Sequence, residues 1–310
     1  MIFHSQHSSI KHKVKTLEVN ALHNRNCLSH KKSVLQCIII GSILLSGIYS
    51  LIKAPLNSQA LYQAELNSML AKYNKSGHRN FHTSGPGHYI AHGGGINQYL
   101  YTNSKEAVEN ALSKGFRFIE LDLQKTNDSH LLAAHDWKHF GRLTGQSGIP
   151  ANLDDALKLK INGGQSPLSG KKIHELLRRY PDWYLVTDKI TDFDLLLREI
   201  PLPERMIVEV FSPQDYIRAL KAGVHYPAFS VPHQAALRQA CVHGYPMIAI
   251  GAELFLSNIE TMRQLHRKGV CIMVFDTEQA GHARFIESHA GTAASMFYIS
   301  TEPPATLSPG

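Results

Sequence analysis

Short apolar runs alternate with helical patterns from residue 88 to the end of the chain, and this alternation constrains the fold more than any other feature. Helical patterns separate most of the runs, and several close with a glycine. A chain of this kind forms a parallel sheet, and about eight β-then-α units in about 220 residues predict an α/β fold, a (β/α)8 TIM barrel over residues 87–305. A doubly wound open sheet is the alternative. The runs expected to be strands are 88–91, 116–123, 131–135, 183–188, 206–211, 227–231, 247–250, 271–275 and 297–300.

One connection does not fit the alternation. The segment TNDS is too short for a parallel crossover, so the runs on either side of it should form an antiparallel hairpin. A turn centred on Asn127 and Asp128 pairs residues whose numbers sum to 255, which places His135 opposite Glu120. Because side chains alternate along a strand, this register puts Glu120, Asp122 and His135 on one face.

Glu120 and Asp122 stand two residues apart in an apolar run. Isolated carboxylates are costly inside a core, and a divalent cation neutralises them well. Oxygen ligands favour Mg²⁺ or Ca²⁺ over zinc or copper. Two ordinary acids at a solvated strand end are the alternative. His92 ends the first run, and His135 with Asp136 ends the return of the hairpin, so neighbouring strand ends deliver two histidines and three acids.

Two stretches, IAHGGG at 90–95 and the residues 103–145, resemble the glycerophosphodiester phosphodiesterase family. That family has a catalytic His-Arg-Gly on its first strand, a Glu-x-Asp on its second, and a His-Asp followed by an Arg and a Thr-Gly turn. The segment FYISTEPP resembles, more weakly, the end of the family's last strand. The positions that match the family pattern are His92, Glu120, Asp122, His135, Asp136, Arg142 and Thr144.

The resemblance implies a TIM barrel that cleaves phosphodiesters with the help of a divalent cation, Mg²⁺ or Ca²⁺. Glu120 and Asp122 would hold the cation, and His92 and His135 would form the acid–base pair. One histidine would deprotonate the attacking water or hydroxyl, and the other would protonate the leaving alkoxide. The substrate would be a glycerophosphodiester, a lipid headgroup or a glycerol-phosphate polymer.

The sequence departs from the family pattern at two places. Gly93 stands where the family has an Arg, so the chain lacks the phosphate clamp that this Arg would provide. The family's later Glu-x-Lys reads TDK here, so Asp188 would be the third metal carboxylate, with Lys189 beside it as a substrate-binding residue. Neighbours in a strand point to opposite faces, so one of the two should face the site unless a bulge intervenes, and we expect Asp188. The sphingomyelinase D relatives also have an Asp there and lack the Arg.

Three further side chains are candidates for substrate binding. Arg142 matches the family's Arg after the His-Asp motif. Trp137 could line the mouth of the site, although aromatic packing is the alternative role. Glu209 lies in the middle of MIVEVF and faces inward or outward depending on the register.

Residues 33–52 form a run without a charge that is long enough to span a bilayer as a helix. The basic leader at 1–32 holds six Lys and Arg, whereas only Lys53 follows closely. This asymmetry predicts a single-pass anchor in the cell membrane, a cytoplasmic N-terminus and a periplasmic or extracellular barrel. A buried core helix and a cleaved signal peptide are the alternatives. Residues 53–86 should hold an amphipathic helix, at 58–73, and a linker.

The charge is concentrated in the leader. The chain has 32 Lys and Arg against 25 Asp and Glu, but the residues after 32 are nearly neutral. Since the body has no basic face by composition, we expect no nucleic-acid partner. The sequence therefore predicts a membrane-anchored, metal-dependent phosphodiesterase. Phospholipase D-like, or sphingomyelinase D-like, action on lipid headgroups is one alternative, and a non-catalytic barrel that binds glycerol-phosphate polymers is another.

Overall fold

The computed structural model describes residues 61–72, 88–150, 152–290 and 293–302. In residues 88–302, eight parallel strands pair in the order β1-β9-β8-β7-β6-β5-β4-β2, and β1 also pairs with β2, which closes the barrel. Closure excludes the open sheet and confirms the predicted barrel. The strands are β1 (Tyr89–Ala91), β2 (Phe118–Lys125), β3 (Leu131–Ala133), β4 (Tyr184–Asp188), β5 (Met206–Val210), β6 (Tyr226–Val231), β7 (Met247–Gly251), β8 (Cys271–Phe275) and β9 (Met296–Ile299).

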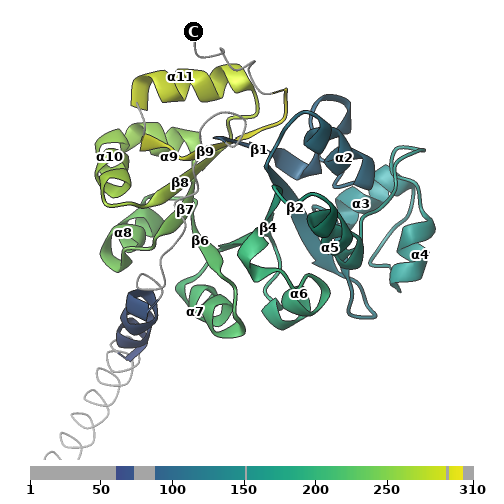
Figure 1. Cartoon of the computed structure of the whole chain (residues 1–310), viewed down its shortest axis with the longest axis horizontal. Coiled ribbons are helices and arrows are strands. Elements are labelled where there is room, and N and C mark those ends of the chain that lie inside the picture. The colour runs from purple at the N-terminus through teal and green to yellow at the C-terminus, as the bar shows by residue number, and fades with distance from the viewer. Residues whose placement is uncertain (1–60, 73–87, 151, 291–292, 303–310) are drawn as a thin grey trace, which may run out of the picture. The chain divides into compact units, whose positions relative to one another are not determined.

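Helices surround the ring of strands (Figure 1). Side chains cap several of them at the N-terminus: Ser104, Ser169 and Ser212 each accept a hydrogen bond from a backbone N–H of the first turn. Left-handed glycines end others, such as Gly223 and Gly244. The α-helices are α2 (Lys105–Ser113), α3 (Trp137–Thr144), α4 (Leu153–Lys158), α5 (Gly170–Arg179), α6 (Phe193–Glu199), α7 (Pro213–Ala222), α8 (Gln234–His243), α9 (Ala252–Ser257), α10 (Ile259–Arg267) and α11 (Ala280–Ala290); the 3-10 turns are η2 (His92–Gly94), η3 (Asn97–Tyr99) and η4 (Pro203–Arg205).

The hairpin of β2 and β3 forms as predicted, but its register is shifted by one residue. Leu123 pairs with Ala133, so partner numbers sum to 256 instead of 255. The turn has three residues rather than two: the N–H of Thr126 donates to the carbonyl of His130 at 2.9 Å, and Ser129 adopts a left-handed φ of 63°. A shift of one residue exchanges the faces of a strand, so the pairing argument for His135 is wrong. His135 reaches the site by another route, because β3 ends at Ala133.

Apolar side chains fill the inside of the barrel below the site. A buried cluster draws members from the parallel strands, among them Ile90, Phe118, Val186, Ile207 and Met273. This packed layer fixes the strands relative to one another. Polar side chains that face inward at the carboxyl ends of the same strands are therefore held on a rigid frame.

Residues 61–72 are helical, within the amphipathic helix expected at 58–73. None of the helices in the described ranges is long and apolar enough to cross a bilayer. The leader predicted at 1–32 and the span predicted at 33–52 lie outside the described residues.

Candidate active site

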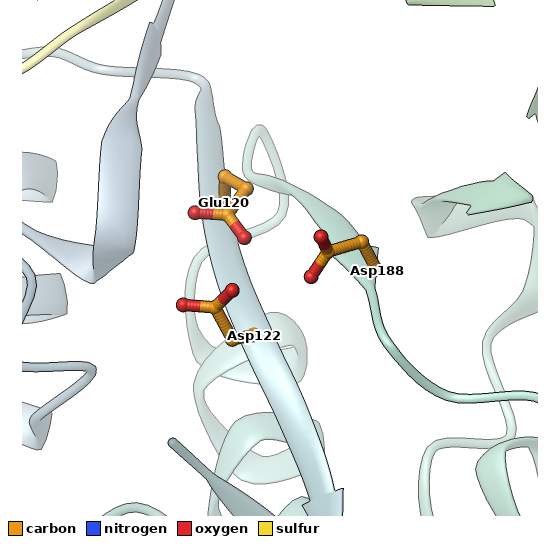
Figure 2. Close-up of side chains that lie close together, drawn as sticks. All are labelled: Glu120, Asp122 and Asp188. Carbon is orange, nitrogen blue, oxygen red and sulfur yellow. The ribbon is translucent and has the colours of Figure 1, made fainter. Parts of the chain in front are cut away.

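Three carboxylates from two neighbouring strands meet at the carboxyl end of the barrel. Glu120 and Asp122 project from β2, and Asp188 ends β4, where its Cα atom pairs with that of Asp122. One oxygen from each of the three lies within 4.8 Å of the others. Figure 2 shows the carboxylate of Asp188 turned toward the two on β2. The three side chains, named here the acidic triad, bring the predicted metal ligands together.

Burial makes two members of the acidic triad hard to ionise. Burial and then the charge of Asp122 raise the pKa of Glu120 well above its ordinary value, although the N–H of Gly93 donates to Glu120 Oε2 at 2.7 Å. Burial and the charge of Asp122 also raise the pKa of Asp188 to about 8. Oδ1 of Asp188 is buried and accepts no hydrogen bond. Lys189 Nζ lies 3.9 Å from the other oxygen, Oδ2, so Oδ1 is the oxygen of Asp188 without a hydrogen-bond partner, and a bound cation would supply one.

Asp122 is the member of the triad that carries the charge. Burial raises its pKa, but the ion pair with Lys189 and hydrogen bonds with Lys189 and Asn103 outweigh burial, so the pKa is lowered. Asn103 Nδ2 donates to Asp122 Oδ2 at 2.9 Å, and the N–H of Asp122 donates back to Asn103 Oδ1 at 3.0 Å. Asp122 is therefore fixed from two sides.

Asp188 and Lys189 both face the site. Alternation along a strand allowed only one of them, but Lys189 adopts a left-handed φ of 60° at the end of β4. This turn brings the ammonium group back to Asp122, while Asp188 still points inward. Asp188 faces inward as expected, and Lys189, expected as a substrate-binding residue, faces the site as well because the backbone departs from regular strand geometry there.

His92 follows β1 directly and lines the same cavity as the acidic triad. Its Nδ1 lies 3.0 Å from Glu278 Oε1. The rings of Tyr101 and Tyr298 meet the imidazole edge to face, with centroids 5.0 Å and 5.5 Å away. The imidazole is thus held by one carboxylate and two aromatic rings.

His135 lies in the segment between β3 and α3 and lines the same cavity. Its Nδ1 lies 2.7 Å from Asp136 Oδ2, and its side chain is half exposed. Asp136 also caps α3 by accepting from the N–H of His139 at 2.6 Å. The hydrogen bonds from His139 and then His135 lower the pKa of Asp136 to about 2, so this carboxylate is charged at neutral pH. His92 and His135 therefore each have a carboxylate on Nδ1.

The other predicted residues divide between the cavity and the core. Arg142 lines the cavity from α3, and Glu209 lines it from β5, where burial raises its pKa. Trp137 does not line it: its ring meets Phe140 edge to face at 6.0 Å and packs against a separate apolar cluster. Thr144 donates to the carbonyl of Phe140 at 2.8 Å and so stays within its own helix.

Two further residues belong to the site although no sequence motif indicates them: Tyr101 lines the cavity, and Glu278 contacts His92. Glu278 lies three residues after β8 ends, at the edge where a barrel presents its polar groups, and this position was the available signal. Tyr101 lies in an irregular segment with a left-handed φ of 52°, and no sequence pattern marks it. The cavity has a volume of about 470 Å³, and its lining includes the apolar residues Phe211, Pro232 and Phe275, named here the apolar wall.

Comparison with known proteins gives one family and many related folds. The sequence pattern of the glycerophosphoryl diester phosphodiesterase family matches residues 92–248, which is half of the chain. No curated protein matches the chain. A glycerophosphoryl diester phosphodiesterase from Parabacteroides distasonis superposes with a TM-score of 0.57 at 17% identity, over 69% of this chain and 82% of that one.

Two further solved structures show the same fold. A glycerophosphodiester phosphodiesterase from Thermotoga maritima has a TM-score of 0.54 at 14% identity, over 69% of this chain and 94% of that one. A phosphodiesterase from Oleispira antarctica, in complex with its product sn-glycerol-3-phosphate, has a TM-score of 0.57 at 14% identity, over 69% of this chain and 93% of that one. At these identities the similarity shows the fold alone.

Proposed function

This chain belongs to the glycerophosphoryl diester phosphodiesterase family and is a phosphoric diester hydrolase, and we propose that it cleaves glycerophosphodiester-type bonds by acid–base catalysis from His92 and His135 beside a divalent cation. The observation that carries the proposal is the joint geometry of one cavity. Both histidines and the acidic triad line it, and each histidine has a carboxylate on Nδ1.

The acidic triad has the chemistry of a site for Mg²⁺ or Ca²⁺. Its donors are all carboxylate oxygens, and Asp188 Oδ1 is buried without a partner. When bound there, a divalent cation supplies positive charge that neutralises the phosphate oxygens and polarises the phosphorus. Glu120, Asp122 and Asp188 would hold it.

The protein's own groups account for the proton transfers. A neutral imidazole accepts the proton of the attacking water or substrate hydroxyl, and the protonated one donates to the leaving alkoxide as the P–O bond breaks. Arg142 and Lys189 are the cationic side chains in the cavity that attract the phosphodiester. The Oleispira antarctica phosphodiesterase holds sn-glycerol-3-phosphate, which supports a substrate of this class.

A second candidate function is phospholipase D-like release of a lipid headgroup. The observation that favours it is the apolar wall, in which Phe211 is 54% exposed. Such a wall can take the apolar part of a lipid. Gly93 adds to this case, because the Arg clamp of the family is missing there.

We also propose that the chain is anchored in the cell membrane by residues 33–52, with the barrel on the periplasmic or extracellular side. The support is the charge-free run and the basic leader that precedes it. Protease added outside spheroplasts should remove the barrel and spare the leader. A barrel that resists this protease contradicts the orientation.

The activity test uses the full chain with Mg²⁺, Ca²⁺ or chelator. Glycerophosphocholine and an aryl phosphodiester report on water-soluble diesters, and phosphatidylcholine vesicles report on headgroup release. Turnover of the soluble diesters that chelator abolishes is the expected result. Turnover of vesicles alone favours the lipid function, and metal binding without any turnover favours a barrel that only binds.

A further inference from the structure

Glu278 is held in place by hydrogen bonds to three other residues. Its Oε1 lies 3.0 Å from His92 Nδ1, and its Oε2 accepts from the hydroxyl of Ser300. The N–H of Ser300 donates to the backbone carbonyl of Glu278 at 2.7 Å, and Tyr101 donates to the carboxylate. The carboxylate therefore has little freedom to move away from His92.

These contacts decide which nitrogen of His92 carries a proton. Burial raises the pKa of Glu278, but the hydrogen bonds from His92, Ser300 and Tyr101 outweigh burial and lower the pKa to about 2. An ionised carboxylate can only accept hydrogen bonds, so the Nδ1 of His92 must donate. The remaining ring nitrogen, Nε2, then has the lone pair that a general base needs.

Glu278 lies just after the end of β8, a strand that contributes neither a proposed metal ligand nor a proposed acid–base group. It follows β8, while Ser300 follows β9, and Thr277 donates to the carbonyl of Tyr298 on β9. The segment after β8 is thus fastened to β9 beside the ring of His92. Glu278 also has a φ of 23°, which residues other than glycine rarely adopt, and these hydrogen bonds maintain that conformation.

We propose that Glu278 is a positioning residue that holds His92 in the tautomer and orientation in which Nε2 exchanges a proton with the substrate. Asp136 has the same relationship to His135. The inference rests on the proposed function, because Glu278 acts only through His92. A purely structural role for Glu278 is the alternative.

The experiment is a double-mutant cycle in the full chain with its divalent cation and glycerophosphocholine. Glu278→Gln keeps the size of the side chain and removes its charge. It should lower kcat by at least about 10-fold and by up to about 10⁴-fold, the loss known for amide replacement of a carboxylate behind a catalytic histidine, and leave KM within about twofold. In the His92→Ala background, the same change should have no further effect, because the residue through which Glu278 acts is gone.

The matched control is a second histidine–glutamate pair outside the cavity. His88 Nε2 lies 3.4 Å from Glu287 Oε1, and neither residue lines the cavity. Glu287→Gln should leave kcat unchanged. If Glu278→Gln does not fold, Ser300→Ala removes one hydrogen bond from Glu278 without touching His92, and should cause a smaller loss of kcat that also disappears with His92→Ala.

The outcomes separate this inference from the proposed function. Wild-type kcat in His92→Ala would overturn the role of His92 and the inference together. A loss of activity in His92→Ala with wild-type kcat in Glu278→Gln overturns the inference alone. Additive effects of the two changes overturn it as well, because they show that Glu278 acts independently of His92.

Discussion

Gly93 and Tyr101 are so close that a Cβ atom added to Gly93 would lie 2.7 Å from the Cα atom of Tyr101. The family pattern has an Arg at the position of Gly93, and this chain has no room for any side chain there. Gly93 also has a left-handed φ of 61°, which glycine adopts freely. The close approach of the Tyr101 backbone therefore requires glycine at position 93 and leaves no space for the Arg of the family pattern.

Gly93→Ala should therefore be more destabilising than a glycine replacement at a similar φ in open space. The matched control is Gly163→Ala, because Gly163 has a φ of 75° and a Cβ atom there meets nothing within 4 Å. We expect a loss of about 1 to 2 kcal/mol in the free energy of unfolding for the control. The steric conflict at Gly93 should add about 1 to 3 kcal/mol. Urea unfolding measures both, and equal losses would contradict the argument.

Gly93→Arg should not restore a phosphate clamp. The nearest atom to the new Cβ is the backbone Cα of Tyr101, so removing the aromatic ring does not make room. We expect Gly93→Arg to lower kcat/KM, and the double variant with Tyr101→Ala to stay below the wild type. A double variant with increased kcat/KM would show that the segment around Tyr101 can move aside.

Asp122 and Asp188 should respond oppositely to neutralisation in the protein without a divalent cation. Asp122→Asn breaks the ion pair with Lys189 and should cost about 3 to 5 kcal/mol of unfolding free energy. Asp188→Asn should cost less than about 1 kcal/mol at pH 7, because a carboxyl with a pKa of about 8 is already mainly protonated there. Urea unfolding in chelator checks the order. A larger loss in Asp188→Asn would contradict the charge assignment.

The high pKa of Asp188 predicts a pH dependence of stability. The folded state holds the proton of this carboxyl up to a pKa of about 8, whereas the unfolded chain releases it near 3.8. Between these values the folded state binds more protons, so rising pH lowers its stability. In chelator, the wild type should lose more stability than Asp188→Asn between pH 5 and pH 8. Asp188→Asn is the control, because it keeps all other titrating groups. Equal dependence of unfolding free energy on pH in the two proteins would contradict the prediction.

The same carboxyl links the cation to pH. A cation binds the ionised form of Asp188. At pH 5 it has to displace a proton from almost every molecule, whereas at pH 8 about half of the molecules have already lost this proton. The rise in Tm on adding Mg²⁺ or Ca²⁺ should therefore be larger at pH 8, and Asp188→Asn should reduce it. A larger rise at pH 5 would show that the cation does not bind through this carboxyl.

The barrel, Glu120 and Asp122 were accessible from the sequence because they depend on periodic patterns and on strand ends, whereas Asp188 was expected only from the resemblance to the family. His135 was also indicated by the strand end and by the family pattern, but the pairing argument for it was wrong, because one extra residue in a turn changes every pairing and no pattern distinguished a three-residue turn from a two-residue one. The orientation of Lys189 depends on a single backbone angle. Glu278 pairs with His92 across 186 residues, and such a contact leaves no mark on local spacing.

The last prediction separates the metal ligands from the acid–base pair. Glu120→Gln removes a ligand charge from the acidic triad, so calorimetric titration should show the loss of Mg²⁺ or Ca²⁺ binding. His135→Ala should leave the affinity for the cation nearly intact, because His135 pairs with Asp136 and lies outside the triad. The kcat of the His135→Ala variant should fall by roughly two to four orders of magnitude, the usual range for a general acid or base.

The control for His135→Ala is His139→Ala, since His139 also lines the cavity and its ring lies 5.7 Å from that of His135, but it has no assigned role in proton transfer. His139→Ala should retain most of the activity and all of the affinity for the cation. If His135→Ala loses the cation while Glu120→Gln keeps it, the roles are reversed. A histidine-ligated transition metal would then explain the site better than a carboxylate-bound Mg²⁺ or Ca²⁺, because imidazole suits zinc and its neighbours.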